Sequence, residues 1–583
     1  MTVILGVTGS GNTTLLNIIA GLCKSDQGEI FCNGFPISAI SLRDICSVVR
    51  QNASYLSSLL VEEQLYFTSE LMMANLSKEE RLKSIRWIVD HLRMKRFLAT
   101  PIGTATRGGI SEGEKRKLAL ACVIMMNPKV LVVDEPLGGL DAVAIEDVIR
   151  TLSLLKDRGT CVICSIHSLP SHLLEVFDRV IVLASGQIAF FGTVEETKEY
   201  FNQIHTQLLN SHSIVSAMFD TTHLSYSQPV TEIQKENDLQ LLSHLYRHST
   251  NRQQNDIQIR EGENLPPPLS IQTQIHHSEG QVRGSFWKRF VYVMFRRQYQ
   301  ATWWQQYRTL VRREIRLFFR DDRLFVSRTI QTILISLFLG IVYLQIPLSQ
   351  PGVRNRISAM FFILMNESYT ALYSDIAMLS KDLPVVFVES GDGMYRLDAY
   401  FAAITTVAFP LSILFPTIFC LIAYYLIGFQ FAFSRFLGFL GSILLVTNCA
   451  AALGQLIAAA TGNFSLASSL TTVVTLPIIL LGGFYLQGLR VFWFLKWIRY
   501  VSFFYWGYKL LILNQFHGVH FECTPNLPCP YPDDKAVLEA FNVNEYDISI
   551  AVPLLIGMNI VLRILAMMCF ELRGYAAFFK INT

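Results

Sequence analysis

Charged residues are scarce in this sequence, and they are unevenly spread. Asp, Glu, Lys and Arg make up 16% of the 583 residues, whereas hydrophobic residues reach 51%. Two stretches, 399–434 and 436–489, contain none of these four residue types. This composition is typical of a membrane protein. The formal net charge of +3 gives no reason to expect a nucleic-acid partner.

Cysteines with the spacing of a metal site are also missing from the first half of the chain. The pair Cys161 and Cys164 has a CxxC count, but it falls on an apolar, buried-type strand, which favours a structural role. No charged and apolar leader precedes the first glycine turn, so we expect the amino-terminal half to be cytoplasmic. Six of the 11 cysteines are therefore interpreted as reduced core residues: Cys23, Cys32, Cys46, Cys122, Cys161 and Cys164.

The first fourteen residues combine a short apolar run with a glycine-rich turn and the start of an apolar helix. This pattern predicts a strand, a phosphate-binding loop and a helix, which need glycine, four residues, glycine, lysine and then serine or threonine. The lysine is absent, because position 12 is Asn12. Backbone N–H groups at the helix start can still cradle a phosphate. The residues that match or flank the pattern are Gly6, Gly9, Ser10, Gly11, Asn12, Thr13 and Thr14.

Further signals follow in a fixed order along the chain. Residues 129–136, KVLVVDEP, predict a buried strand whose tip presents Asp134 towards a magnesium ion and Glu135 towards an attacking water. The other signals are Gln51, the run ISEGE at 110–114 before a basic helix start, the turn that ends at Asp141, and His167 after the strand 161–166.

With these signals in this order, the chain resembles the ABC transporters, and its segment order resembles their G (White, or white-brown complex) subfamily of half-transporters. The resemblance implies an α/β P-loop NTPase domain followed by an all-α transmembrane domain of six helices. It implies ATP and Mg²⁺ as cofactors and a second half-transporter chain as partner. It assigns Glu135 as general base, His167 as switch histidine, and Gln51 as sensor of the γ-phosphate and magnesium. Nucleotide contacts also fall to the phosphate loop, Ser111, Gly113 and Asp141, and metal contacts to Thr13, Gln51 and Asp134.

Three features depart from the family pattern. Asn12 replaces the lysine, Glu112 replaces the first signature glycine, and the chain begins at the phosphate loop. We interpret the last feature as an amino-terminal truncation or an incomplete domain. A lysine-to-phosphate contact contributes ~1.5 to 3 kcal/mol, so its loss predicts roughly tenfold to hundredfold weaker ATP binding. A carboxylate at Glu112 would add repulsion if it faces the γ-phosphate.

Periodicity and composition predict four regions. These are a nucleotide-binding domain over 1–210, with a helical part at 62–100; a polar linker over 211–306; an amphipathic connecting helix over 307–328 that carries seven arginines; and a transmembrane domain over 329–583. A crossing takes ~20 apolar residues. The predicted spans are 329–346, 357–379, 400–429, 436–460, 466–487 and 548–570, with an external loop over 514–547. Both termini are then cytoplasmic.

The transmembrane domain suggests where substrate binds. Asn366 and Glu367 lie inside the second span, which indicates either a functional site or a contact between helices. By family resemblance, Asn366, Tyr369, Thr472 and Leu476 would face the substrate, and Phe484 and Tyr485 would form an external valve. Such a slot suits lipids, sterols and other hydrophobic small molecules, and family habit favours export at the plasma membrane. Cys523 and Cys529 in the external loop are expected to form a disulfide, within the loop or between subunits.

Two functions remain open at this point. The chain is either an active subunit of an ATP-driven dimeric transporter or a weakly hydrolysing or inactive partner in a heterodimer. A non-functional remnant is a more distant alternative.

Overall fold

The computed structural model describes most of the chain and divides it into two units. The first unit comprises Met1–Gln305, Phe387–Tyr395 and Tyr575–Thr583, and the second comprises Gln306–Val386 and Arg396–Gly574. The described residues are 1–6, 9–23, 25–33, 35–37, 42, 45–51, 54–104, 108–167, 171–184, 186–200, 246, 252, 299–320, 322–485, 492–521 and 529–580. Most of the predicted linker over 211–306 lies outside them.

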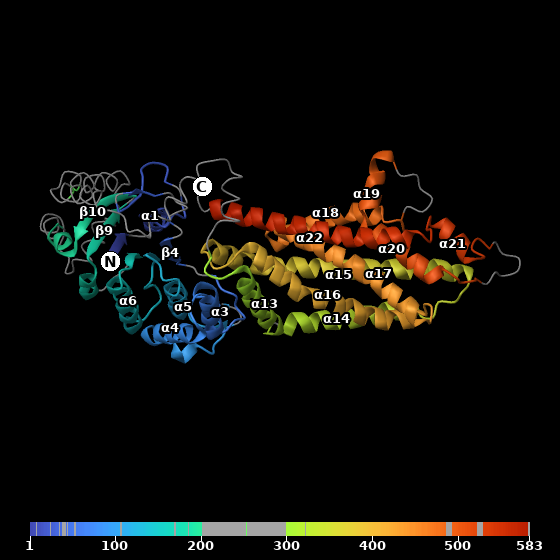
Figure 1. Cartoon of the computed structure of the whole chain (residues 1–583), viewed down its shortest axis with the longest axis horizontal. Helices are drawn as coiled ribbons and strands as arrows, with labels where there is room; N and C mark the ends of the chain where they lie inside the picture. Colours follow the sequence, from blue (N-terminus) through green and yellow to red (C-terminus); the bar gives the residue numbers. More distant parts are fainter. Residues whose placement is uncertain are drawn as a thin grey trace, which may run out of the picture. The chain divides into compact units, whose positions relative to one another are not determined.

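The first unit is built on a six-stranded mixed sheet with the order β10-β9-β1-β8-β7-β4 (Figure 1). Five strands are parallel, and β10 pairs antiparallel with β9 at one edge. The strands are β1 (Thr2–Gly6), β4 (Cys46–Val49), β7 (Val130–Asp134), β8 (Cys161–Ile166), β9 (Arg179–Ala184) and β10 (Gln187–Thr193). Short pairs form β2 (Phe31–Cys32) with β3 (Phe35–Pro36) and β5 (Gly103–Thr104) with β6 (Gly108–Gly109).

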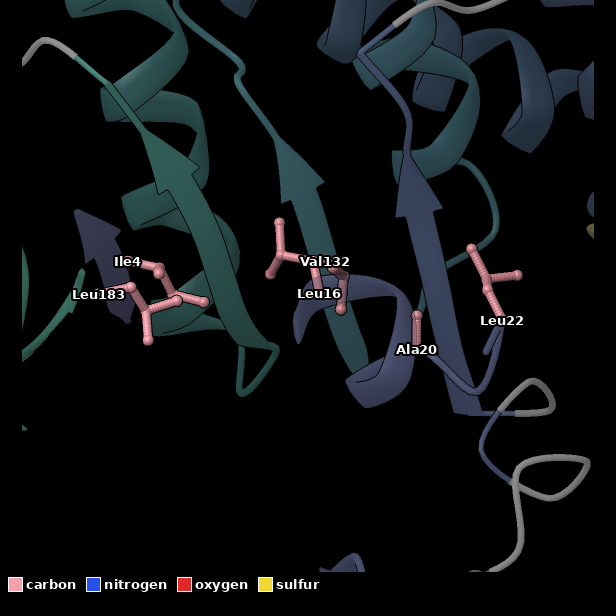
Figure 2. Close-up of a cluster of buried hydrophobic side chains, with 6 residues drawn as sticks. All are labelled: Ile4, Leu16, Ala20, Leu22, Val132 and Leu183. Carbon is pink, nitrogen blue, oxygen red and sulfur yellow. The ribbon is translucent and has the colours of Figure 1, made fainter. Parts of the chain in front are cut away.

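Helix α1 (Asn12–Ile19) follows β1 and packs on this sheet. Leu16 and Ala20 are buried in one cluster with Ile4 of β1, Val132 of β7 and Leu183 of β9 (Figure 2). Burying a leucine side chain contributes about 1.5 to 3 kcal/mol, so this cluster holds α1 against the sheet.

The remaining helices of the first unit begin at capping residues. Ser77 starts α4 (Lys78–His91) and Ser111 starts α5 (Glu112–Ile124), each through a capping box. Asp141 accepts a hydrogen bond from Ala144 N at 2.8 Å and starts α6 (Ala142–Asp157). With α3 (Val61–Met72), helix α4 confirms the helical prediction for residues 62–100. Two 3-10 turns, η1 (Lys95–Phe97) and η2 (Ser171–Val176), also belong to this unit.

The second unit is helical, which confirms the predicted fold class (Figure 1). Its helices are α13 (Trp303–Arg320, from the unit boundary), α14 (Asp322–Val342), α15 (Gln350–Gly391), α16 (Leu397–Ile427), α17 (Phe433–Thr461), α18 (Phe464–Leu480), α19 (Lys496–Val501), α20 (Phe503–Phe516), α21 (Asp534–Ala540) and α22 (Asp547–Lys580), with the turn η3 (Trp493–Leu495).

Four described helices are long and apolar enough to cross a membrane: α14, α16, α17 and α22. The other two predicted spans fall on α15, which carries charged residues, and on α18, which has 17 residues. Six spans therefore stay a prediction. The end of the fifth predicted span, including Gln487, lies outside the described residues.

The connecting helix was predicted at the wrong boundaries. It begins at Trp303 and not at residue 307, because Thr302 and Gln305 form a capping box: Thr302 N donates to Gln305 Oε1 at 2.9 Å, and Gln305 N donates to Thr302 Oγ1 at 3.4 Å. It ends at Arg320, and residues 322–328 belong to α14. That helix ends at Val342, short of the predicted residue 346, because Gln345 N instead donates to Leu426 O at the end of α16.

The predicted external loop over 514–547 also needs correction. Helix α20 continues to Phe516, helix α21 occupies Asp534–Ala540, and α22 begins at Asp547. Lys509 Nζ donates to Asp547 Oδ2 at 2.9 Å, and both side chains are largely buried, so the ion pair ties α20 to the start of α22. Cys529 is disulfide-bonded, while Cys523 lies outside the described residues.

Candidate functional site

Three parallel strands bring the predicted nucleotide residues to one edge of the sheet. Leu5 of β1 lies in register with Ile166 of β8, and Asp134 of β7 lies in register with Ser165. The carboxyl ends of parallel strands form the edge at which α/β sheets bind ligands. The phosphate loop, the two acids and His167 therefore gather at this edge.

The phosphate loop has the backbone that a phosphate cradle requires. Gly9 and Gly11 have φ angles of 88° and 98°, in the left-handed region that favours glycine. A Cβ on Gly9 would meet no atom within 4 Å, so the loop is open there. Gly11 leads directly into α1, whose amino-terminal N–H groups and helix dipole favour an anion.

Asn12 occupies the lysine position, and its side chain folds back into the loop. It is only 5% exposed. Its Nδ2 donates to Gly6 O at 3.0 Å, and Ser10 Oγ donates to Asn12 Oδ1 at 3.1 Å. A Cβ on Gly6 would lie 2.7 Å from Asn12 Oδ1, so the amide packs directly on this glycine. The polar atoms of the Asn12 side chain are therefore hydrogen-bonded within the loop, at the position where the motif would place a cation.

The proposed catalytic carboxylate is held by both of its predicted neighbours. Gln51 Nε2 donates to Glu135 Oε2 at 2.6 Å, and His167 Nε2 contacts Glu135 Oε1. His167 Nδ1 donates to Gly6 O at 2.6 Å, because a carbonyl oxygen only accepts. Gly6 O therefore receives hydrogen bonds from both Asn12 and His167.

Two further residues position Glu135, and the sequence analysis missed both. Ser165 Oγ donates to Asp134 Oδ1 at 2.6 Å and accepts from Glu135 N at 3.0 Å. Arg116 Nη1 donates to Glu135 O. Glu135 has a φ of 47°, and these two partners hold its backbone in that uncommon conformation. No local sequence pattern predicts either contact, because Ser165 and Arg116 lie far from Glu135 in the sequence.

Thr13, Gln51 and Asp134 supply oxygen atoms at this same edge, and hard oxygen ligands are what Mg²⁺ prefers. Asp134 is 7% exposed, and Ser165 Oγ orients one of its oxygens. Among the described residues no three His, Cys, Asp or Glu side chains form a metal cluster. Mg²⁺ is usually bound through one or two carboxylates together with phosphate oxygens and water. When bound, the ion would neutralise charge on the phosphates.

The signature residues form a second group at the start of α5. Ser111 caps the helix, and a Cβ on Gly113 would lie 2.8 Å from Gly139 O, so the helix start packs against the turn that leads to Asp141. Ser111, Glu112 and Asp141 are exposed. Glu112 does not stand alone, because Lys115 Nζ donates to its Oε1 at 2.7 Å. An ion pair therefore occupies the place where the family pattern has a glycine.

An ion pair anchors the residue next to Gln51. Arg50 donates from both Nη atoms to the two carboxylate oxygens of Asp392, each at 2.9 Å. Asp392 follows α15 in the segment Phe387–Tyr395, which belongs to the first unit. Tyr395 donates its hydroxyl to the buried Glu389 in the same segment.

Cys46, Cys122 and Cys164 are buried, as predicted for core residues. Cys23 and Cys32 are half-buried and Cys161 is exposed at the start of β8, so the prediction of a core position is wrong for Cys161. Burial raises the pKa of Cys164 and of Cys122 to about 12, so both are protonated thiols at neutral pH. Partial burial of the Cys161 thiol also raises its pKa. None of the six forms a disulfide.

In the second unit, the predicted cavity residues occur on α15, on α18 and just after α18. Tyr369 Oη is 3.2 Å from Thr475 Oγ1, which joins the two helices. Thr472 and Leu476 are exposed on α18.

The polar and aromatic members of this group have partners within the chain. Asn366 Nδ2 donates at 3.0 Å to Glu367, which is 3% exposed, so the observed contact is a hydrogen bond between neighbours. Phe484 stacks on Phe361 with centroids 4.3 Å apart, and Tyr485 meets the same ring edge-on.

Comparison with known proteins identifies both parts of the chain. Residues 1–138 match the family model of the ABC transporter, and residues 305–516 match that of the ABC-2 type transporter. Protein white of Drosophila melanogaster is 29% identical over 98% of this chain and 81% of its own length. The permease wht-1 of Caenorhabditis elegans is 26% identical over 98% and 85%. ATP-binding cassette sub-family G member 5 of Mus musculus is 26% identical over 89% and 77%.

These matches run through both domains, in the order in which the motifs and the apolar helices occur. The chain belongs to the G subfamily of ABC transporters, as an integral membrane half-transporter whose nucleotide-binding domain precedes its membrane domain.

Proposed function

We propose that this chain is the weakly hydrolysing subunit of a dimeric, ATP-driven transporter for lipids, sterols or other hydrophobic small molecules. One observation carries the proposal: the Asn12 side chain is buried and hydrogen-bonded within its own phosphate loop. The site that this loop builds therefore has no side-chain cation at the lysine position for the terminal phosphates. A second ABC half-transporter would supply the stronger ATP site.

We propose a dimer because the family builds each ATP site from the phosphate loop of one chain and the signature of the other chain. The exposed Ser111 and Asp141 support this, since both are available to a second chain. The hydrophobic cargo is supported by the second unit, where the exposed Thr472 and Leu476 lie on one face of α18. We place the transporter in the plasma membrane, with export as its direction and both termini in the cytoplasm.

One observation favours the alternative of an active subunit. Glu135 is held by Gln51 and His167 as a working general base would be. If backbone N–H groups alone bind the phosphates tightly enough, this arrangement can hydrolyse ATP.

The experiment compares the ATPase activity of the chain purified alone with that of the chain co-purified with a second G-subfamily half-transporter. We expect at most weak vanadate-sensitive ATPase activity from the chain alone, and much stronger activity together with stable co-purification for the pair. Vanadate-sensitive hydrolysis by the chain alone at a rate comparable to that of the pair would establish the active subunit. Failure to retain any second chain would remove the heterodimer from the proposal.

A further inference from the structure

A groove of about 770 Å³ lies in the second unit, among α16, α17, α20 and α22. Its volume is within the range of roughly 300 to 1,000 Å³ over which proteins bind small ligands. None of the predicted cavity residues on α15 and α18 lines it. The groove is therefore a different site from the substrate slot of the proposed function.

The body of the groove is apolar and faces outward from the helix bundle. Phe409 of α16 and Ile548, Ile556 and Ile560 of α22 line it, and all four side chains are largely exposed. Three of the four helices that form it are apolar enough to cross a membrane. In a membrane, the groove would open sideways to the lipid chains.

Two glycines on α17 line the groove and place no side chain in it. A Cβ on Gly441 would meet no atom within 4 Å, so the space above this position is open. A Cβ on Gly438 would lie 2.2 Å from Asn514 Nδ2, so this glycine allows α20 to approach α17. The open space at Gly441 makes this position suitable for a larger side chain that fills the groove.

One end of the groove carries opposite charges. Arg435 lies in the first turn of α17, and Glu545 lies just before α22. Arg435 donates from Nη1 to Asn514 O and from Nη2 to His517 O, each at 3.0 Å. These bonds use two of the five N–H groups of the guanidinium, and within the described part of the chain no carboxylate pairs with it. Glu545 Oε1 is 3.9 Å from His517 Nδ1.

The length of the groove fits one leaflet of a bilayer. Arg435 and Asn448 both line it and are 13 residues apart on α17, which corresponds to about 20 Å along a helix. Half of the hydrocarbon core of a bilayer is about 15 Å. The groove therefore runs from the headgroup level to near the middle of the membrane.

We propose that this groove binds one zwitterionic phospholipid. The acyl chains lie along α17 and α22, the phosphate contacts Arg435, and the ammonium group contacts Glu545. A sterol has a single hydroxyl group and would bring no opposite charge to Arg435 or to Glu545. A phospholipid with net negative charge would place its additional charge close to Glu545.

The test uses the full chain in nanodiscs that contain phosphatidylethanolamine with a photoreactive group in an acyl chain. After irradiation, cross-linked peptides are identified by mass spectrometry. We expect peptides of α17 and α22 to be labelled. Gly441→Leu fills the groove, and because each displaced methylene weakens binding about fourfold, we expect labelling to fall by about tenfold or more.

Gly557→Leu is the matched control. Gly557 lies on α22 outside the groove, and a Cβ there also meets no atom within 4 Å. This variant should label like the unmodified chain. Arg435→Gln should lower labelling roughly tenfold to hundredfold by removing a charged hydrogen bond, whereas Arg435→Lys keeps the charge and should retain most of it.

Three results would overturn the proposal. The first is equal labelling of Gly441→Leu and the unmodified chain. The second is preferential labelling of the groove by a photoreactive sterol or by phosphatidylglycerol. The third is a cross-link between the groove and a second protein chain in place of lipid. None of them depends on ATP, so the proposed nucleotide role stands or falls separately.

Discussion

Replacing Asn12 by lysine tests the physical basis of the weak ATP site. In the native loop, Asn12 donates to Gly6 O and accepts from Ser10 Oγ. Asn12→Lys removes both hydrogen bonds and introduces a cation at the position where the motif expects one. The change therefore has two separable effects, one on the stability of the loop and one on nucleotide affinity.

The two effects differ in magnitude and in the state that they act on. Two neutral hydrogen bonds contribute about 0.5 to 1.5 kcal/mol each, so the free energy of unfolding should fall by about 1 to 3 kcal/mol. This loss is common to the empty and ATP-bound protein and leaves affinity unchanged. A charged hydrogen bond to phosphate contributes about 1.5 to 3 kcal/mol, so ATP should bind about tenfold to hundredfold more tightly.

The assay is a titration of the full-length protein with a fluorescent ATP analogue in the presence of Mg²⁺. Asn12→Ala is the control, because it removes the same hydrogen bonds without adding charge. We expect this variant to lose stability like Asn12→Lys while its ATP affinity stays close to that of the native chain. Equal ATP affinity in Asn12→Lys and the native chain would refute the reasoning.

Three further predictions follow from the same structure. Tags at Asp533 and at the carboxyl terminus should be accessible from opposite sides of the membrane, and labelling of both from one side would refute the count of six spans. Asp392→Asn should lower the thermal stability of the nucleotide-binding unit, by about 1.5 kcal/mol in unfolding free energy, because it breaks the partly exposed ion pair with Arg50; an unchanged melting temperature would contradict this. Ser165→Ala should cost about 1 to 3 kcal/mol of unfolding free energy, because it leaves the Glu135 N–H without its partner; calorimetry measures the loss, and a stability equal to the native value would show that the bond contributes little.

The edge that gathers the nucleotide residues could be predicted from the sequence. Strand-like runs that end at Gly6, Asp134 and Ile166 belong to one parallel sheet, and parallel strands present their carboxyl ends together. The residues that orient this edge could not be predicted. Arg116 of α5 donates to the backbone of Glu135, which follows β7, and a contact between residues distant in sequence leaves no local pattern.

The membrane part shows the same division. Uncharged runs predicted the long helices. The ends of the helices depend on capping residues, which an average composition does not reveal. Thr302 and Gln305 start the connecting helix four residues earlier than its arginines suggested. Helix α20 is almost entirely buried and packs on α17, although its aromatic residues would suit a membrane interface equally well.

Transport by the assembled heterodimer, with the proposed general base changed in one subunit at a time, tests the central claim most directly. Losing a general base typically slows a reaction about 100- to 10,000-fold. Under the proposal that Asn12 weakens the ATP site that contains Glu135, we predict that Glu135→Gln in this chain reduces transport only weakly, whereas the equivalent change in the partner stops it. Complete loss of transport from Glu135→Gln in this chain would show that its site hydrolyses ATP despite Asn12, and would contradict the account.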